Sequence, residues 1–108
     1  MEYRVELAGR ARRDLDHLYL SINAGESVAA ARWYDRLEKS IQALDHLPYR
    51  CAVAPESKKG GRQLRHLLFG RRPRVYRVIF EIHEPQLEVF ILAIRHWAMD
   101  VAQADELD

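Results

Sequence analysis

The last third of the chain restricts the fold most, because it contains three strand-like runs separated by turns of only four residues. The runs cover residues 62–69, 74–82 and 87–95, and the turns cover residues 70–73 and 83–86. Turns this short connect neighbouring strands as hairpins, so the pairing is antiparallel. The third run is almost continuously apolar, which is typical of an internal strand buried on both faces. The segment therefore predicts a three-stranded antiparallel meander.

The N-terminal part of the chain follows different periods. Residues 2–7 alternate between polar and apolar side chains, which predicts a short strand. Residues 8–22 and 28–47 carry apolar side chains at helical spacing; Gly25 follows the first helix, Ser27 is the N-cap of the second, and Pro48 ends it. The short connection makes the two helices antiparallel neighbours. The fold class is α+β: an N-terminal strand, an antiparallel helix hairpin packed on one face of a mostly antiparallel sheet, and the C-terminal meander.

The chain has 108 residues, which is the size of a single domain, here residues 1–108 with an acidic tail or short helix at 98–108. No apolar run approaches the roughly 20 residues that a membrane span needs, and charged residues interrupt the first 25 residues. Cys51 is the single cysteine, which excludes an internal disulfide and a cysteine-rich zinc site. We expect a cytoplasmic protein without a metal or cofactor.

The basic residues are unevenly distributed. Residues 58–77 hold eight of the 17 lysines and arginines and none of the 16 acidic residues. This block predicts either an electropositive patch for a polyanion or a solvated strand face with basic turns. Strand parity places Tyr76, Val78, Phe80 and Ile82 on the face toward the helices, so Arg77 projects from the opposite, open face.

Several segments together carry a family resemblance that covers nearly the whole chain. They are Ala30-Ala31-Arg32-Trp33-Tyr34, Ile41-x-x-Leu44-x-x-Leu47-Pro48, Arg62-x-Leu64-Arg65, Tyr76-Arg77-Val78-Ile79-Phe80 and Val89-x-Ile91-Leu92-x-Ile94-Arg95-His96. In this order and spacing the sequence resembles the RelE/ParE superfamily of toxins from bacterial type II toxin–antitoxin (plasmid stabilisation) systems.

The resemblance implies a growth inhibitor that is neutralised by a cognate antitoxin, encoded adjacently. One branch of the superfamily cleaves mRNA on the ribosome, and the other inhibits DNA gyrase without nuclease activity. The leading hypothesis from the sequence is a ribosome-dependent, metal-independent endoribonuclease (an mRNA interferase). The alternatives are a ParE-like gyrase inhibitor and a degenerate, non-toxic interaction module.

The resemblance also suggests roles for individual residues. Arg77 comes from the family's Tyr-Arg motif and would bind the scissile phosphate, with Arg65 as a second clamp. His96 would be the general acid or base, because imidazole is the side chain best suited to gain and lose a proton near neutral pH, and Glu81 is a more distant base. The residues expected to hold nucleic acid are Lys58, Lys59, Arg62, Arg71, Arg72 and Arg74, with Trp97 stacking on a base.

Two further expectations concern the branch and the partner. No tyrosine follows Tyr76, although some nuclease members have one in their C-terminal segment, and this departure fits the gyrase branch. The antitoxin is expected to cover Arg62, Arg65 and Arg74 with acidic side chains, laying an extended segment and a helix along the sheet and the helix hairpin.

Overall fold

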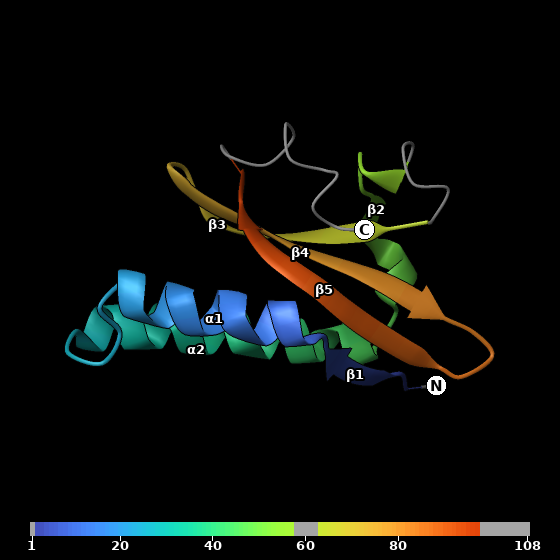
Figure 1. Cartoon of the computed structure of the whole chain (residues 1–108), viewed down its shortest axis with the longest axis horizontal. Helices are drawn as coiled ribbons and strands as arrows, with labels where there is room; N and C mark the ends of the chain where they lie inside the picture. Colours follow the sequence, from blue (N-terminus) through green and yellow to red (C-terminus); the bar gives the residue numbers. More distant parts are fainter. Residues whose placement is uncertain (1, 58–62, 98–108) are drawn as a thin grey trace.

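The computed structural model describes residues 2–57 and 63–97, which form two helices packed on one face of a five-stranded sheet (Figure 1). The α+β class expected from the sequence is confirmed. The two helices are α1 (Gly9–Ser21) and α2 (Val28–Gln42). The strands are β1 (Arg4–Leu7), β2 (Ala52–Val53), β3 (Arg65–Arg71), β4 (Arg74–His83) and β5 (Glu88–His96).

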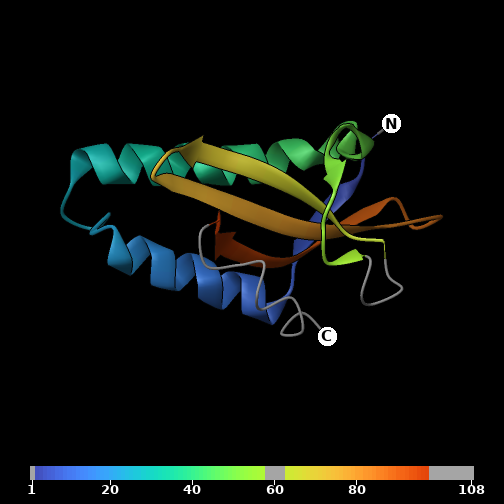
Figure 2. The same ribbon diagram turned by 90° about the horizontal axis from the view of Figure 1, so that it is seen from above.

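The helices form where the sequence pattern predicts them. In α1 the buried side chains are Ala11, Leu15 and Leu18, spaced three or four residues apart, so they share one face of the helix. The Ser27 hydroxyl accepts a hydrogen bond from the Ala30 amide at 3.2 Å, and therefore caps α2 as expected. Figure 2 shows the two helices running in opposite directions, joined by one loop at the far end of the molecule.

The sheet order is β1-β5-β4-β3-β2. The meander β3-β4-β5 is antiparallel throughout, whereas β1 pairs with β5 in parallel, from Arg4 opposite Glu88 to Leu7 opposite Ile91. The prediction of a mostly antiparallel sheet is confirmed, and β5 is an internal strand between β1 and β4.

The structure differs from the sequence prediction at the end of α2, between α2 and β3, and at the end of β3. The second helix ends at Gln42 and continues as two short 3₁₀ turns, η1 (Ala43–Asp45) and η2 (Pro48–Arg50). Leu47 between them has a φ of 50° and a ψ of 52°, in the left-handed region, so the chain leaves the helical path directly before Pro48. The short strand β2 lies between the expected second helix and the meander, where the sequence pattern predicts no element. Strand β3 runs to Arg71, so the hairpin turn is shorter than expected.

The main core lies between the helices and the sheet. Val78 and Phe80 of β4 are fully buried there, and Tyr76 and Ile82 pack at its margin, which confirms the predicted parity of this strand. The opposite face of the sheet has a second, smaller core of Ala54, Leu64 and Ile79. The segment after β2 therefore covers part of the face that the sequence pattern left open.

A β-bulge changes the parity of β5. The partners of Ile79 and Phe80 are Ala93 and Ile91, so Leu92 is an extra residue without a partner in β4. Before the bulge, Val89 and Ile91 face the helices, and after it Ile94 does. The regular alternation of a strand therefore does not continue across Leu92, and the residues after it change faces.

Candidate functional site

Arg77 is at the centre of the most unusual polar cluster in the described part of the chain. It lies on the sheet face opposite the helices, as expected, but its exposed fraction is only 1%. Its guanidinium donates two hydrogen bonds to the Glu56 carboxylate, from Nη1 to Oε2 at 2.7 Å and from Nη2 to Oε1 at 2.6 Å. The expectation that Arg77 projects into open solvent is therefore wrong, because the segment after β2 brings Glu56 over it.

His66 completes this cluster from the neighbouring strand β3. The Arg77 Nε donates to the Nδ1 of His66 at 3.0 Å, which requires that nitrogen to be unprotonated. Burial lowers the pKa of His66, and the positive charge of Arg77 lowers it further, against the opposing effect of Glu56. The histidine is therefore neutral near pH 7 and acts as a hydrogen-bond acceptor.

Trp97 lies beside this cluster. Its ring centroid is 5.9 Å from the Arg77 Cζ and 6.3 Å from the His66 ring centroid. The side chain remains 42% exposed. Trp97 therefore has both a cation–π contact with a buried guanidinium and an accessible surface.

Arg65 points to a different part of the molecule. Its Nη1 donates to the carbonyl oxygens of Cys51 at 2.6 Å and Tyr49 at 3.3 Å, and its Cζ lies 5.0 Å from the centroid of the Tyr49 ring. These contacts hold the backbone of η2 against the start of β3. In this arrangement Arg65 anchors a loop, and its guanidinium is not directed at Arg77.

His96 lies on the helix side of the sheet, because the bulge at Leu92 reverses the parity of the end of β5. Its ring packs edge-on against Tyr76, with the centroids 5.1 Å apart. It lines a hollow of 280 Å³ between α1 and the ends of β4 and β5, together with Asp14 and His17. His96 and Arg77 are thus on opposite faces of the sheet.

Glu81 also has a local partner. Its Oε1 lies 3.0 Å from the Nε2 of His83, whose Nδ1 lies 3.0 Å from Oε1 of Glu88. The hydrogen bonds to Glu81 and Glu88 raise the pKa of His83. The Glu81 carboxylate is therefore part of a surface cluster of charged side chains at the C-terminal end of β4.

The expected nucleic-acid-binding residues fall into two groups. Arg71, Arg72 and Arg74 are exposed at the tip of the β3–β4 hairpin. The other group, Lys58, Lys59 and Arg62, lies outside the described residues, as does the segment 98–108. Arg71 is directly opposite Arg74 in the register, so the hairpin tip is strongly cationic.

Glu56 and His66 are the residues that sequence reasoning missed. Glu56 lies in a segment without any hydrophobic period, 21 residues before Arg77. The alternation along β3 indicates the face of the sheet on which His66 lies, but the contact of His66 with Arg77 depends on the register between β3 and β4. The one available signal was the place of Glu56, an acidic residue just before the block 58–77, which has eight basic residues and no acidic one.

The described residues include no helix with the length and apolar character needed to cross a lipid bilayer. The same residues contain no cluster of three or more histidine, cysteine, aspartate or glutamate side chains suited to a metal ion.

Comparison with known proteins identifies the family. Residues 5–101 match the family model of the ParE toxin of the type II toxin–antitoxin system parDE. A search of curated proteins finds no match. Three similar solved structures are a mutant of the E. coli toxin RelE in the free state, the chromosomal ParDE system of P. aeruginosa, and the RelBE2 toxin–antitoxin complex of Mycobacterium tuberculosis.

The structural agreement extends over most of each chain. RelE has a TM-score of 0.59 at 16% identity, over 99% of this chain and 90% of that one. The P. aeruginosa ParDE chain has a TM-score of 0.67 at 21% identity, over 88% of this chain and 96% of that one. The RelBE2 chain has a TM-score of 0.55 at 25% identity, over 89% of this chain and 99% of that one. Because the family model matches most of this chain, residues 5–101, the chain belongs to the ParE toxin family of type II toxin–antitoxin systems.

Proposed function

We propose that this toxin inhibits growth by binding DNA gyrase, without nuclease chemistry of its own, and that a cognate antitoxin neutralises it. The observation that carries the proposal is the pairing of Arg77 with Glu56. A carboxylate already takes both terminal nitrogens of the arginine that would have to bind the scissile phosphate.

The chemistry of metal-free RNA cleavage sets a geometric requirement. A base must activate the 2′-hydroxyl, cationic donors must stabilise the charge on phosphorus, and an acid must protonate the leaving oxygen, all around one phosphate. Arg77 and His96 lie on opposite faces of the sheet, and Arg65 is held against Tyr49 and Cys51. These candidates do not meet at one phosphate, which favours an activity based on binding.

Family membership supports the same branch. The matching family model is that of ParE toxins, and the ParE-like branch of the superfamily is the one associated with gyrase inhibition. Two of the similar structures, ParDE and RelBE2, are described as toxin–antitoxin systems or complexes, which supports an antitoxin as the partner of this chain.

The direct test is a supercoiling assay with purified bacterial gyrase, relaxed plasmid and ATP. We expect the supercoiled product to decrease as toxin approaches the gyrase concentration, and we expect induced cells to lose plasmid supercoiling and show a DNA-damage response. Toxin that has been mixed with its antitoxin is the matched control and should leave gyrase active.

Ribosome-dependent mRNA cleavage is the second candidate, favoured by Trp97, whose partly exposed ring lies beside a guanidinium and could stack on a base. Its test is the mapping of transcript ends in a translation extract. If the toxin cuts transcripts and leaves gyrase active, and a folded His96→Ala variant no longer makes these cuts, mRNA cleavage replaces gyrase inhibition as the proposed function. Harmless expression together with active gyrase would instead indicate a degenerate interaction module.

A further inference from the structure

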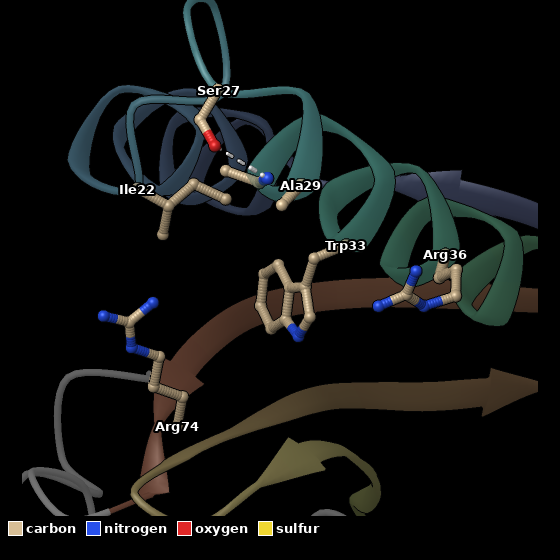
Figure 3. A pocket seen from close by; sticks show the side chains of 7 residues that line it. Ile22, Ser27, Ala29, Trp33, Arg36 and Arg74 are labelled. Carbon is tan, nitrogen blue, oxygen red and sulfur yellow. Dashed lines mark hydrogen bonds between the residues drawn. The ribbon is translucent and has the colours of Figure 1, made fainter.

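The turn between β3 and β4 carries a concentration of arginines. Arg71, Arg72 and Arg74 are all exposed there, and Arg71 is directly opposite Arg74 in the register. Arg36 of α2 lines the same cavity of 550 Å³ as these three residues. We call the four residues the arginine surface. Figure 3 shows the Trp33 ring between two of them, Arg74 and Arg36.

The arginine surface has an excess of positive charge. Its four arginines form no ion pair with a carboxylate in the ranges 2–57 and 63–97, and the lining of the cavity contains no acidic residue. Arg71 and Arg74 are cross-strand partners, and like charges in that position destabilise a hairpin. An anionic ligand that lies over both side chains would remove this repulsion.

The backbone that carries these arginines is held rigidly. Gly70 has a φ of 100°, and a Cβ added there would collide with the carbonyl oxygen of Arg74, so the two strands close tightly at this point. Phe69 and Tyr76, which are cross-strand partners, pack edge-on against Trp33 at 5.3 and 5.5 Å between ring centroids. Only the arginine side chains themselves therefore have to be ordered when a ligand binds.

The composition of the arginine surface favours a nucleic-acid backbone over a protein partner. Arginine suits phosphate because its planar guanidinium forms two parallel hydrogen bonds and always keeps its charge. The centre of a protein interface is instead depleted of charged residues. Double-stranded DNA carries one negative charge per about 1.7 Å of helix axis, so several adjacent arginines can each find a phosphate.

The shape of the turn favours DNA over duplex RNA. The major groove of B-DNA is wide enough to admit a two-stranded β-ribbon, whereas that of duplex RNA is deep and too narrow. Strands β3 and β4 form such a ribbon, and Figure 1 shows their turn at the same end of the molecule as the loop that joins α1 and α2.

We propose that the arginine surface binds the phosphate backbone of duplex DNA, with the β3–β4 turn directed into the major groove. The inference rests on the proposed function in one respect, which is that this DNA is the duplex held by gyrase. The toxin then binds the complex of gyrase with DNA more tightly than gyrase alone, because its contacts with the enzyme and with the DNA act together.

The first test measures DNA binding by the full chain without gyrase. A labelled 20-base-pair duplex is titrated with toxin at several salt concentrations, and binding is followed by fluorescence anisotropy. If each of the four arginines neutralises one phosphate, the logarithm of the association constant should fall against the logarithm of salt concentration with a slope of about −3.6. The variant R71Q/R74Q should reduce this slope to about −1.8 and weaken binding at least about tenfold in 0.1 M salt.

A matched variant controls for net charge. R12Q/R13Q removes two positive charges at exposed positions of α1 outside the arginine surface, and it should leave the slope within about 0.5 of the value for the unmodified chain. R36Q provides a second variant that leaves the β3–β4 hairpin unchanged, and it should reduce the slope by about 0.9. Thermal unfolding of each variant checks that it is folded.

The second test measures the affinity of the toxin for gyrase with and without a bound duplex. We expect the unmodified toxin to bind more tightly when the duplex is present, and R71Q/R74Q to bind equally in both cases. Equal binding by the unmodified toxin would overturn the proposal and leave the proposed function intact. If the toxin does not bind gyrase in either case, the proposed function fails, and the duplex titration decides whether the arginine surface binds DNA.

Three results of the titrations would also overturn the proposal. The first is the same salt slope for R71Q/R74Q and R12Q/R13Q. The second is equal affinity for a duplex RNA of the same sequence, which would exclude reading of the DNA major groove. The third is binding of a polyglutamate peptide, sensitive to R71Q/R74Q, without binding of the duplex, which would identify the arginine surface as a site for an acidic protein segment.

Discussion

Removal of the Glu56 carboxylate should destabilise the fold severely. Glu56→Ala leaves the Arg77 guanidinium at 1% exposure without the two charge-assisted hydrogen bonds, of 2.6 and 2.7 Å, that now neutralise it. Breaking a buried ion pair from one side costs about 3–5 kcal/mol. A domain of this size has a total stability of about 5–15 kcal/mol, so the loss is a large fraction of the total.

The double variant Glu56→Leu with Arg77→Met separates the loss of the pair from the burial of a lone charge. Replacing both partners with apolar groups removes the desolvation cost together with the attraction, and such replacements are often neutral or stabilising. Here His66 Nδ1 loses its donor, which costs about 1–3 kcal/mol. The double variant should therefore be more stable than Glu56→Ala, despite carrying two changes.

The assay is urea unfolding followed by tryptophan fluorescence, with the free energy of unfolding taken from the linear extrapolation. The control is Asp35→Ala, which breaks an exposed pair with Lys39 at 3.1 Å and should cost about 0.5 kcal/mol or less. If Glu56→Ala costs no more than this control, the Arg77 charge is not buried in solution, and the case against phosphate binding at Arg77 fails.

Three further predictions follow from local geometry. Gly70→Ala should cost at least about 1 kcal/mol in thermal unfolding, because Gly70 has a φ of 100° and an added Cβ would collide with the Arg74 carbonyl; an unchanged melting temperature would contradict this conformation. The unfolding free energy should decrease as pH falls below the unfolded pKa of His66, near 6.5, because the folded pKa is lower and the unfolded state binds the proton first. His66→Gln should flatten that dependence in urea titrations at pH 5 and pH 7.5, and an equally steep profile would exclude His66. Asp14→Ala should cost about 1–3 kcal/mol, since Asp14 Oδ2 accepts a hydrogen bond from the part-buried Ile94 amide at 3.0 Å, and faster hydrogen exchange at that amide would identify the cause.

The parts of the fold that could be predicted from the sequence are those set by local periodicity. The apolar spacing of α1 and α2 and the serine before α2 are short-range features, and so is the alternation along β4, which placed Tyr76 and Val78 on the helix side. Local patterns determine these elements because each side chain's direction follows from its own backbone.

The site was harder to predict because it depends on long-range pairing. The bulge at Leu92 is visible only in the register with β4, and it moves His96 to the helix side. Glu56 reaches Arg77 through a segment with no period, so its position depends on packing of Ala54 and Leu64 against the sheet. The burial of Arg77 and the position of His96 therefore both depend on contacts between distant segments, which local periodicity does not contain.

The parallel contact between β1 and β5 has a consequence for how the toxin is made. The partners of Arg4 and Leu7 are Glu88 and Ile91, so β1 cannot join the sheet until β5 has been synthesised. During translation the N-terminal strand and the helix hairpin emerge first, without the surface on which they pack, and long-range pairing is slow to form. An antitoxin that is already present can therefore meet the chain before its sheet is complete.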